Sequence, residues 1–399
     1  MALNKPLEEL TEADLMELIA SRIEERRTLD YKLTLPGNSG EDSKEFVADV
    51  SSFANTAGGH LIYGMREENG VAAELVGVDG DFDAEMLRLD SRVRDGIAPR
   101  IPSERMKAVQ LSNSKWALVI RIEKSFISPH MVTLGGRKKF YARASNGRYE
   151  LDVDQLRSAF LNSESVASKI REFRIDRIAR IKSGDTPIPL MAGPYIVLHV
   201  LPVGAFSSPL QTDILKLVAD ARVHQVLAPV HQEFANDRRI NLDGFVVYQI
   251  REAGKALGYT QLYRNGAIES VDWSFIYSSS PVMQGGQKVL ASLDFEQGLV
   301  TAVERFFGVL RFLAADPPFV LMLTLIGVKG WGMALGGRPF RHNEFDRDIL
   351  MIPEVVVDSL NVNAGTILKP VFDSVWNASG GFESPYYENG VWVGNRRGR

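Results

Sequence analysis

The sequence predicts an α+β protein with more than one domain, and three observations lead to this prediction. Short strand-like runs and amphipathic helical stretches are mixed along the chain without regular alternation. The length of 399 residues suits two or three domains of ordinary size. Residues 184–194 contain three prolines and two glycines, which indicates a boundary near residue 185. We therefore expect a first domain over 1–165, a basic helix and linker over 166–190, and a C-terminal α+β domain over 191–399.

The first domain is expected to begin with a helix over 11–26. Thr11 is a suitable N-cap with Asp14 three residues on, and Leu15, Leu18 and Ile19 keep helical spacing. Alternating and buried apolar runs predict strands, and 3.6-residue periodicity predicts helices. The elements expected next are a strand over 29–33, a helix over 43–55, a strand over 60–65, a helix over 83–93, strands over 116–122 and 139–143, and a helix over 152–161.

A basic amphipathic helix is expected over 169–182. Its arginines recur every third residue, at Arg171, Arg174, Arg177 and Arg180. We interpret this stripe as a solvated helix face, with a nucleic-acid groove as the alternative. The second half then predicts strands over 195–203, 244–250, 319–328 and 354–360, helices over 212–221, 296–315 and 365–376, and a hairpin over 260–271 that turns at Asn265-Gly266.

The composition excludes several classes of protein. Hydrophobic residues make up 45% and charged residues 24% of the chain, which is a normal globular mixture. Cysteine is absent, so disulfides and Cys-based zinc sites are excluded. The longest apolar run, over 319–328, is about half of the ~20 residues that span a bilayer. With a polar N-terminus and no secretory signal, the chain is expected to be soluble and cytoplasmic, without a membrane partner.

The segment from Glu25 to Glu67 carries the clearest chemical pattern. In a strand-helix-strand unit, Glu25, Asp30 and Glu67 can converge at one end of the sheet. Divalent cations prefer such hard oxygen ligands, and a bound metal lowers the pKa of an attacking water in phosphodiester hydrolysis. We therefore predict these acids as catalytic ligands of Mg²⁺ or Mn²⁺. Lys32, which shares a strand face with Asp30, is predicted to contact the scissile phosphate.

Two other interpretations of these acids stay open. In a metal-free site, one acid acts as the base and Lys32 is its electrostatic partner. In the simplest case, the acids are solvated side chains at the ends of helices and strands. Glu24 and Asp49 are alternative acids for the first and accessory positions.

Residues 53–59 form the block Phe-Ala-Asn-Thr-Ala-Gly-Gly. We expect a structural role for it, in which Asn55 caps the preceding helix and Gly58-Gly59 makes a turn with positive φ. The alternative is a phosphate site built from exposed backbone amides. The phosphate loop GxxxxGK[ST] does not occur in the sequence, so a nucleotide-sensing module ranks last among the functions considered.

Basic and aromatic residues gather around a hairpin near residue 140. Strand alternation places Lys139, Tyr141 and Arg143 on one face, and cations beside an aromatic ring suit the RNA backbone and stacked bases. The alternative is a charged edge strand that resists aggregation. The predicted nucleic-acid-binding residues are Arg137, Lys138, Lys139, Tyr141, Arg143 and Arg148.

These motifs also carry a family resemblance. The segment resembles the Schlafen domain, also called AlbA_2, whose pattern is an acid, four residues, a second acid, an aromatic and a lysine. A helix, a FANTxGGxLxxG block and a third acid follow. The matching positions, in order, are Glu25, Asp30, Lys32, 53–59, Gly64 and Glu67, and the likeness continues to about residue 160. The chain departs from the pattern at two positions, because the second acid is usually Glu and the third is usually Asp.

The resemblance implies an N-terminal Alba-like Schlafen lobe, with a mixed sheet and packed helices, followed by a second α+β domain that is a candidate for a diverged second lobe. It implies a metal-dependent endoribonuclease that cleaves structured RNA, with tRNA as the first expected substrate, and a role as an anti-phage defence effector. A homodimer is a further expectation, because one lobe offers only one wall of a channel. The alternative is a nucleic-acid-binding regulator or adaptor without catalysis.

Overall fold

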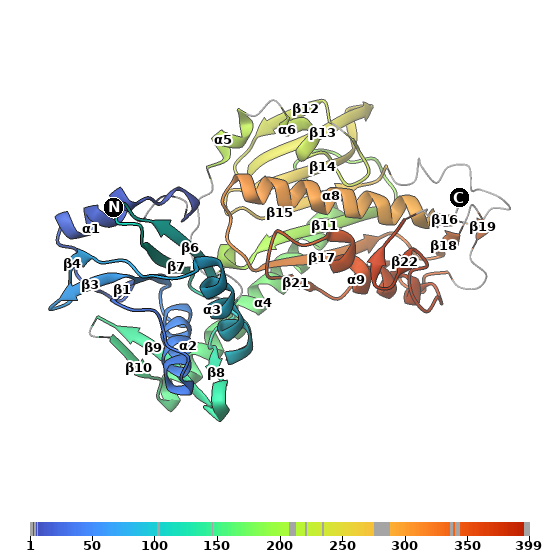
Figure 1. The fold of residues 1–399 in the computed structure, drawn as a ribbon. Coiled ribbons are helices and arrows are strands. Elements are labelled where there is room, and N and C mark those ends of the chain that lie inside the picture. The colour runs from blue at the N-terminus through green and yellow to red at the C-terminus, as the bar shows by residue number, and fades with distance from the viewer. Residues whose placement is uncertain are drawn as a thin grey trace. The chain divides into compact units, whose positions relative to one another are not determined.

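The computed structural model describes residues 1–399 except 1, 2, 4, 6, 102, 103, 126, 146, 207–212, 220, 221, 234, 275–287, 336, 337, 340–343 and 395–399. The described residues form two compact units, Met1–Ala167 and Ser168–Arg399. Both units combine helices and sheets, so the predicted α+β class is confirmed (Figure 1).

Unit 1 is built around a mixed sheet with the strand order β1-β2-β7-β6. β1 and β2 pair in parallel, and the other pairs are antiparallel. A second sheet has the order β10-β9-β8-β5, and β3 and β4 form a separate hairpin. The elements are η1 Leu7–Glu9, α1 Glu12–Ala20, β1 Leu29–Lys32, α2 Gly40–Ala54, β2 Gly59–Tyr63, β3 Met65–Glu68, β4 Val71–Leu75, α3 Phe82–Gly96, β5 Ile97–Ala98, β6 Glu104–Gln110, β7 Trp116–Ile122, β8 Met131–Val132, η2 Leu134–Gly136, β9 Lys139–Ala144, β10 Gly147–Glu150 and α4 Val153–Ser183.

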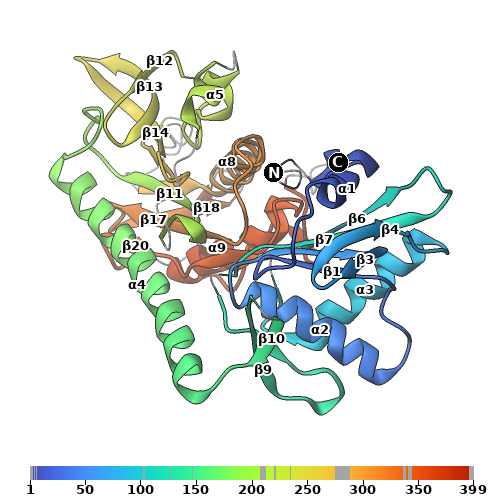
Figure 2. The ribbon, with the colours of Figure 1, turned by 90° about the vertical axis from the view of Figure 1, so that its left-hand side faces the viewer.

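The main sheet of unit 1 buries both of its faces. On β2, Leu61 and Tyr63 pack into a core with α2 and α3, whereas Ile62 packs into the core beside α1. Figure 2 shows α2 and α3 on one side of this sheet and α1 on the other. Side chains alternate along a strand, so β1 buries Leu29 and Tyr31 with α1. The intervening Asp30 and Lys32 therefore point to the side of α2.

Two element boundaries in unit 1 differ from the sequence prediction. The capping box of Thr11 and Asp14 forms as expected, but the helix ends at Ala20 rather than at residue 26. Arg22 takes a φ of 47°, which ends the helix, so Glu25 lies in the segment between α1 and β1 and not at a helix end. The strand expected over 60–65 is broken at Gly64, whose φ is 88°. Glu67 consequently lies on a different strand, β3, in the hairpin with β4.

The two helices expected over 152–161 and 169–182 are one continuous helix, α4. The division between the two units falls inside α4, between Ala167 and Ser168. The arginine-rich half of the helix therefore belongs to unit 2.

Unit 2 contains a long antiparallel sheet with the strand order β12-β13-β14-β15-β11-β17-β20, in which β21 also pairs with β17. The hairpin expected at Asn265-Gly266 is confirmed as the turn between β14 and β15. The helix expected over 212–221 is only partly described, as α5. The elements are β11 Tyr195–Pro202, η3 Val203–Phe206, α5 Ile214–Val218, α6 Val223–Val226, β12 Asp237–Ile240, β13 Gly244–Glu252, β14 Lys255–Tyr263, β15 Ile268–Asp272, β16 Lys288–Ala291, α8 Ser292–Phe312, β17 Phe319–Ile326, β18 Trp331–Leu335, β19 Arg338–Pro339, β20 Ile349–Met351, β21 Val355–Val357, α9 Ala364–Ala378, β22 Tyr387–Glu388 and β23 Val391–Trp392.

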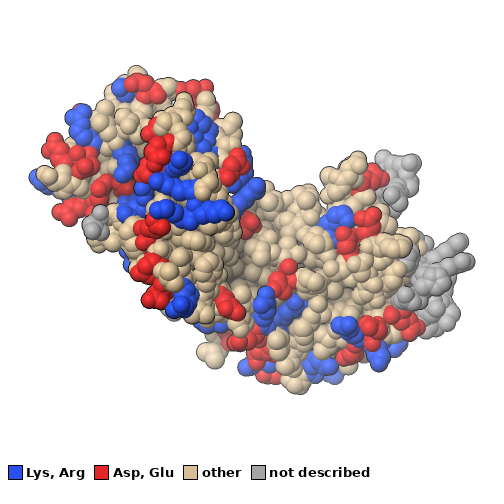
Figure 3. Space-filling view, turned by 90° about the horizontal axis from the view of Figure 1, so that it is seen from below, with Lys and Arg blue, Asp and Glu red and all other residues tan. Residues whose placement is uncertain are grey.

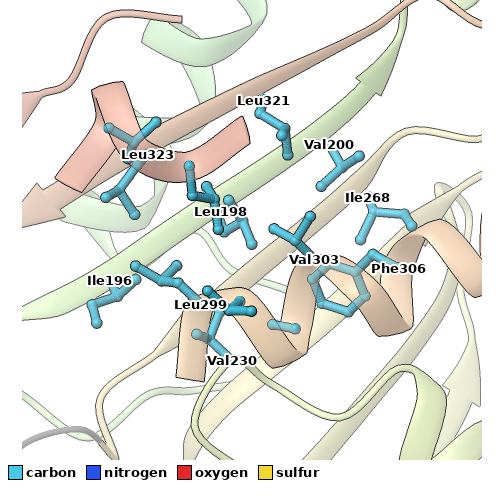
Figure 4. Packing of buried hydrophobic residues seen from close by; sticks show 14 of the residues in the cluster. Ile196, Leu198, Val200, Val230, Ile268, Leu299, Val303, Phe306, Leu321 and Leu323 are labelled. Carbon is cyan, nitrogen blue, oxygen red and sulfur yellow. The ribbon is translucent and has the colours of Figure 1, made fainter. Parts of the chain in front are cut away.

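The core of unit 2 lies between this sheet and α8. Leu198 and Val200 of β11 face Val303 and Phe306 of α8 (Figure 4). The alternate residue Val197 packs on the opposite face, with Ile178 of α4. Among the described residues, no helix has both the length and the apolar character needed to cross a bilayer.

The arginine stripe of α4 is not a solvated face along its whole length. Arg174 and Arg177 are only 6% and 9% exposed. Arg174 donates to Thr324 Oγ1 at 3.0 Å, and Arg177 Nε donates to Glu269 Oε2 at 2.9 Å. These two arginines anchor the helix on the sheet, so our interpretation was wrong for them. Arg171 and Arg180 are exposed, as expected.

Candidate functional site

A polar pocket of about 620 Å³ in unit 1 collects most of the predicted catalytic residues. Its wall includes the extended segment before β1, β1 itself, α2 and the hairpin of β9 and β10. The lining residues are Glu24, Glu25, Arg26, Asp30, Lys32, Glu45, Asp49, Asn69, Gly70, Arg143, Ser145, Gly147 and Arg148. Acids and bases from distant parts of the chain therefore meet at one place.

Glu25 is held at the pocket by backbone hydrogen bonds on both sides. Its N–H donates to Gly70 O at 2.6 Å, and its Oε1 accepts from Tyr31 N at 2.8 Å. The side chain is half-buried. Its carboxyl also shares a hydrogen bond with the carboxyl of Asp30, so two acids are in direct contact.

Asp30 lies at the centre of the charged network. Lys32 Nζ donates to its Oδ1 at 2.8 Å, and Arg143 Nη2 donates to its Oδ2 at 2.8 Å. Asp30 and Arg143 are buried, whereas the Lys32 side chain is 41% exposed. Lys32 is therefore the cation of this group that a ligand in the pocket can reach.

α2 contributes two further acids to the pocket, Glu45 and Asp49, which are four residues apart. Arg148 binds both of them, and its Nη1 lies 2.7 Å from Asp49 Oδ1. Arg143 lies 3.8 Å from the same Asp49 oxygen. Asp49 thus connects the two arginines of the hairpin.

Residues 53–59 hold the hairpin in place. Asn55 Nδ2 donates to the carbonyl oxygens of His130 and Tyr141, each at 2.9 Å, and Thr56 Oγ1 accepts from Arg143 N at 3.0 Å. Gly58 has a φ of 70°, as the sequence predicts, and its N–H donates to Phe53 O. The block therefore supports the site by placing Arg143 over Asp30. That amide of Gly58 is consequently engaged within the turn.

The network separates the pKa values of the two contacting acids. Burial raises the pKa of Glu25 to about 7, and the hydrogen bond with Asp30 adds to the shift. Burial acts to raise the pKa of Asp30 as well, but the positive charge of Arg143, the hydrogen bond from Glu25 and the charge of Lys32 outweigh it. The pKa of Asp30 is therefore lowered. Near pH 7 the pair therefore exchanges one proton with the solvent, and this proton resides mainly on Glu25 when it is bound.

Glu67, the third predicted metal ligand, does not line this pocket, although Gly70, to which it is hydrogen-bonded, does. Its exposed carboxylate accepts a hydrogen bond from Gly70 N in the β3–β4 turn, and it is not among the pocket-lining residues. Within the described part of the chain, no group of three or more His, Asp or Glu side chains is arranged to hold a metal ion. The described residues do not form the predicted three-carboxylate site. The break at Gly64 explains this difference.

Most of the predicted nucleic-acid-binding residues are buried or form ion pairs with acidic side chains of this unit. Lys139, Tyr141 and Arg143 do share a face of β9, but Tyr141 and Arg143 are buried against α2. Tyr141 is therefore not a stacking platform for bases, and that part of the prediction was wrong. Lys139 pairs with Glu150, and Arg137 with Glu41 and Glu45. Lys138 is exposed.

Figure 3 shows how charged side chains in general are distributed on the face of unit 1 that is seen from below. Lys and Arg side chains gather there, with Asp and Glu side chains among and around them. This mixture agrees with the small net charge of −4. Binding of a polyanion on this face therefore requires local cations rather than a strongly positive domain.

The comparison with known families decides what this unit is. Residues 25–152 match the family model described as Schlafen, AlbA_2. Unit 1 contains a Schlafen-type domain. The match begins at Glu25 and ends after β10, so it includes every residue that lines the charged pocket except Glu24.

Solved structures show weaker likeness. A crystal structure of the DIP2311 protein from Corynebacterium diphtheriae covers 35% of this chain and 29% of its own length, at 18% identity and a TM-score of 0.26. The chain thus spans less than a third of that protein. The NMR structure of the N-terminal domain of a RecG-related protein from Nitrosomonas europaea covers 29% of this chain and 73% of its own length, at 21% identity and a TM-score of 0.23. No curated protein matches the chain.

Proposed function

We propose that the Schlafen-type domain is an endoribonuclease and that the pocket of Glu25, Asp30 and Lys32 cleaves the phosphodiester bond. The observation that supports this proposal is the contact between Glu25 and Asp30 beside a reachable Lys32 ammonium. A carboxyl group that titrates near neutral pH is suited to proton transfer, and a cation beside it is suited to a phosphate. The alternative function is a nucleic-acid-binding adaptor without catalysis, and the cleavage assay distinguishes it from the nuclease.

The contacts suggest a division of roles. Glu25 accepts the proton of the ribose 2′-hydroxyl, whose oxygen attacks phosphorus while the bond from phosphorus to the 5′-oxygen breaks. Lys32 Nζ stabilises the negative charge on the phosphate oxygens and supplies a proton to the leaving 5′-oxygen. Asp30 and Arg143 keep Lys32 and Glu25 in position. Products with a cyclic 2′,3′-phosphate and a free 5′-hydroxyl are expected.

A cleavage assay with the full chain tests the proposal. A total tRNA pool is incubated with the protein, with Mn²⁺ or with EDTA, and the fragments are separated on a denaturing gel. Cleavage in at least one condition supports the nuclease, whereas RNA binding without fragments in every condition leaves only the adaptor. The EDTA arm also tests the predicted requirement for Mg²⁺ or Mn²⁺. A homodimer and a role in anti-phage defence stay predictions that this assay does not address.

The rate of cleavage is expected to rise with pH through about pH 7. Glu25 must be ionised to accept a proton, and its pKa is about 7. Below that value the protonated form predominates, so the logarithm of the rate should rise with a slope of about one and reach a plateau above it. Single-turnover rates between about pH 5 and about pH 9 check this. A rate that falls across the same range would assign Glu25 the opposite role, that of an acid.

A further inference from the structure

A second cavity lies next to the charged pocket in unit 1. It has a volume of about 460 Å³, within the range of roughly 300–1,000 Å³ that is usual for sites of small ligands. Its walls come from α1, from the segment between α1 and β1, and from the start of β2. Arg26 lines both cavities, so the two adjoin at the segment that carries Glu25.

The wall that the two cavities share is a fixed turn. Arg26 and Leu29 exchange two backbone hydrogen bonds of 2.9 Å each, and Thr28 O accepts from His60 N at 2.9 Å. Gly59 packs directly on this turn, because a Cβ at that position would lie 2.3 Å from Thr28 O. The two cavities lie on opposite faces of β1, because Leu29 lines the second cavity and Asp30 lines the charged pocket. A ligand that occupies both would therefore pass over this turn, in the segment that carries Glu25.

The lining of the second cavity combines apolar surface with a few hydrogen-bonding groups. Leu18 and Leu29 are buried apolar side chains in its wall, and Glu17, Ser21 and His60 add polar groups. Burial lowers the pKa of His60 to about 4, with the positive charge of Arg121 adding to the shift, so the ring is neutral at physiological pH. Its Nε2 accepts from Arg121 Nε at 2.8 Å, which leaves the ring proton on Nδ1.

We infer that this second cavity binds a nucleobase next to the scissile phosphate and so gives the nuclease a base preference. This inference rests on the proposed function, because it assigns the adjoining pocket to the phosphate. A nucleotide has a charged part and a flat, neutral heteroaromatic part with hydrogen-bonding edges. The charged pocket suits the first part, and the more apolar cavity with its neutral histidine and acceptor groups suits the second. Bases in single-stranded RNA are free to turn outward into such a site.

Binding of nucleoside monophosphates tests the inference without relying on cleavage. The four ribonucleoside 5′-monophosphates and ribose 5-phosphate are compared by ligand-observed NMR with wild-type protein, Ser21→Trp and Met16→Trp. Ser21, the residue after α1, lines the cavity, and Met16 is an exposed residue of α1 that does not. We expect at least one nucleotide to bind about tenfold more tightly than ribose 5-phosphate, and Ser21→Trp to remove this difference while Met16→Trp keeps it.

Further variants keep the test decisive. If Ser21→Trp does not fold, Ala57→Trp fills the cavity from the turn after α2, where Ala57 is exposed. Glu25→Gln should keep the base-dependent binding, since Glu25 does not line this cavity. Equal binding of ribose 5-phosphate and all four nucleotides, or unchanged binding in both filled variants, overturns the inference. Failure of the nuclease proposal shows separately, as wild-type protein that binds nucleotides with a base preference and yet produces no RNA fragments.

Discussion

Replacing Glu25 by glutamine is expected to slow RNA cleavage by about 10²–10⁴-fold without unfolding the protein. The glutamine carbonyl can still accept the hydrogen bond from Tyr31 N, so the backbone contact of the native side chain is kept. The amide cannot accept the proton of the attacking hydroxyl, so the step assigned to Glu25 is lost. Single-turnover rates on tRNA, with circular dichroism as the test of folding, measure the effect.

Glu67→Gln is the matched control for Glu25→Gln. Its side chain lies on the β3–β4 turn, outside the charged pocket, and a glutamine there still accepts from Gly70 N. We expect cleavage within about threefold of the wild type, because Glu67 is not assigned a role in proton transfer. Equal loss in the two variants would instead support the metal site with three carboxylate ligands that the sequence predicts.

Replacing Glu269 by alanine is expected to destabilise unit 2 by about 3–5 kcal/mol. Glu269 is fully buried and accepts from Arg177 Nε and Nη2, at 2.9 and 3.0 Å, from Tyr259 Oη at 2.8 Å and from His199 Nε2 at 3.0 Å. Its removal leaves the Arg177 guanidinium buried without a counter-ion. Urea unfolding followed by tryptophan fluorescence measures the loss, since four of the five tryptophans lie in unit 2.

The control for the buried network is Glu304→Ala, an exposed position on α8. We expect it to change the free energy of unfolding by less than about 0.5 kcal/mol. The pKa of Glu269 gives a second readout, because burial acts to raise it but the hydrogen bonds from His199 and Arg177 lower it to about 2. Its contribution to stability is therefore present above about pH 4.5 and is lost as the pH falls toward 2. A stability loss no larger than in the control would contradict this account.

The sequence was sufficient to place residues that are neighbours along one strand. Asp30 and Lys32 are two apart, so strand alternation predicts a shared face, and the structure joins them by an ion pair. The partner of Asp30 on its other side, Arg143, lies 113 residues away. Nothing in local spacing indicates that contact, although both residues belong to the matched domain. Asn55 and Thr56 hold Arg143 beside Asp30, through hydrogen bonds to the backbone of β9 and of His130.

Two local backbone conformations decided where the predictions failed. The positive φ of Arg22 ends α1 early, and the positive φ of Gly64 divides one expected strand into two. Helical periodicity and β propensity do not report such turns. The arginines of α4 show a related difficulty. A stripe of arginines on a helix predicts a solvated face when no acidic partner is near in the sequence. The buried partner of Arg177 is Glu269, which is 92 residues away.

A crystal structure of the full chain with a tRNA fragment whose cleavage-site 2′-hydroxyl is replaced by hydrogen tests the central claim most directly. The fragment cannot react, so its backbone should remain in the charged pocket. We predict a phosphate oxygen within hydrogen-bond distance of Lys32 Nζ, with the carboxyl of Glu25 facing the 2′-position. A fragment bound only along Lys138 and Lys139, or a cation held by Glu67 beside the phosphate, would contradict the account.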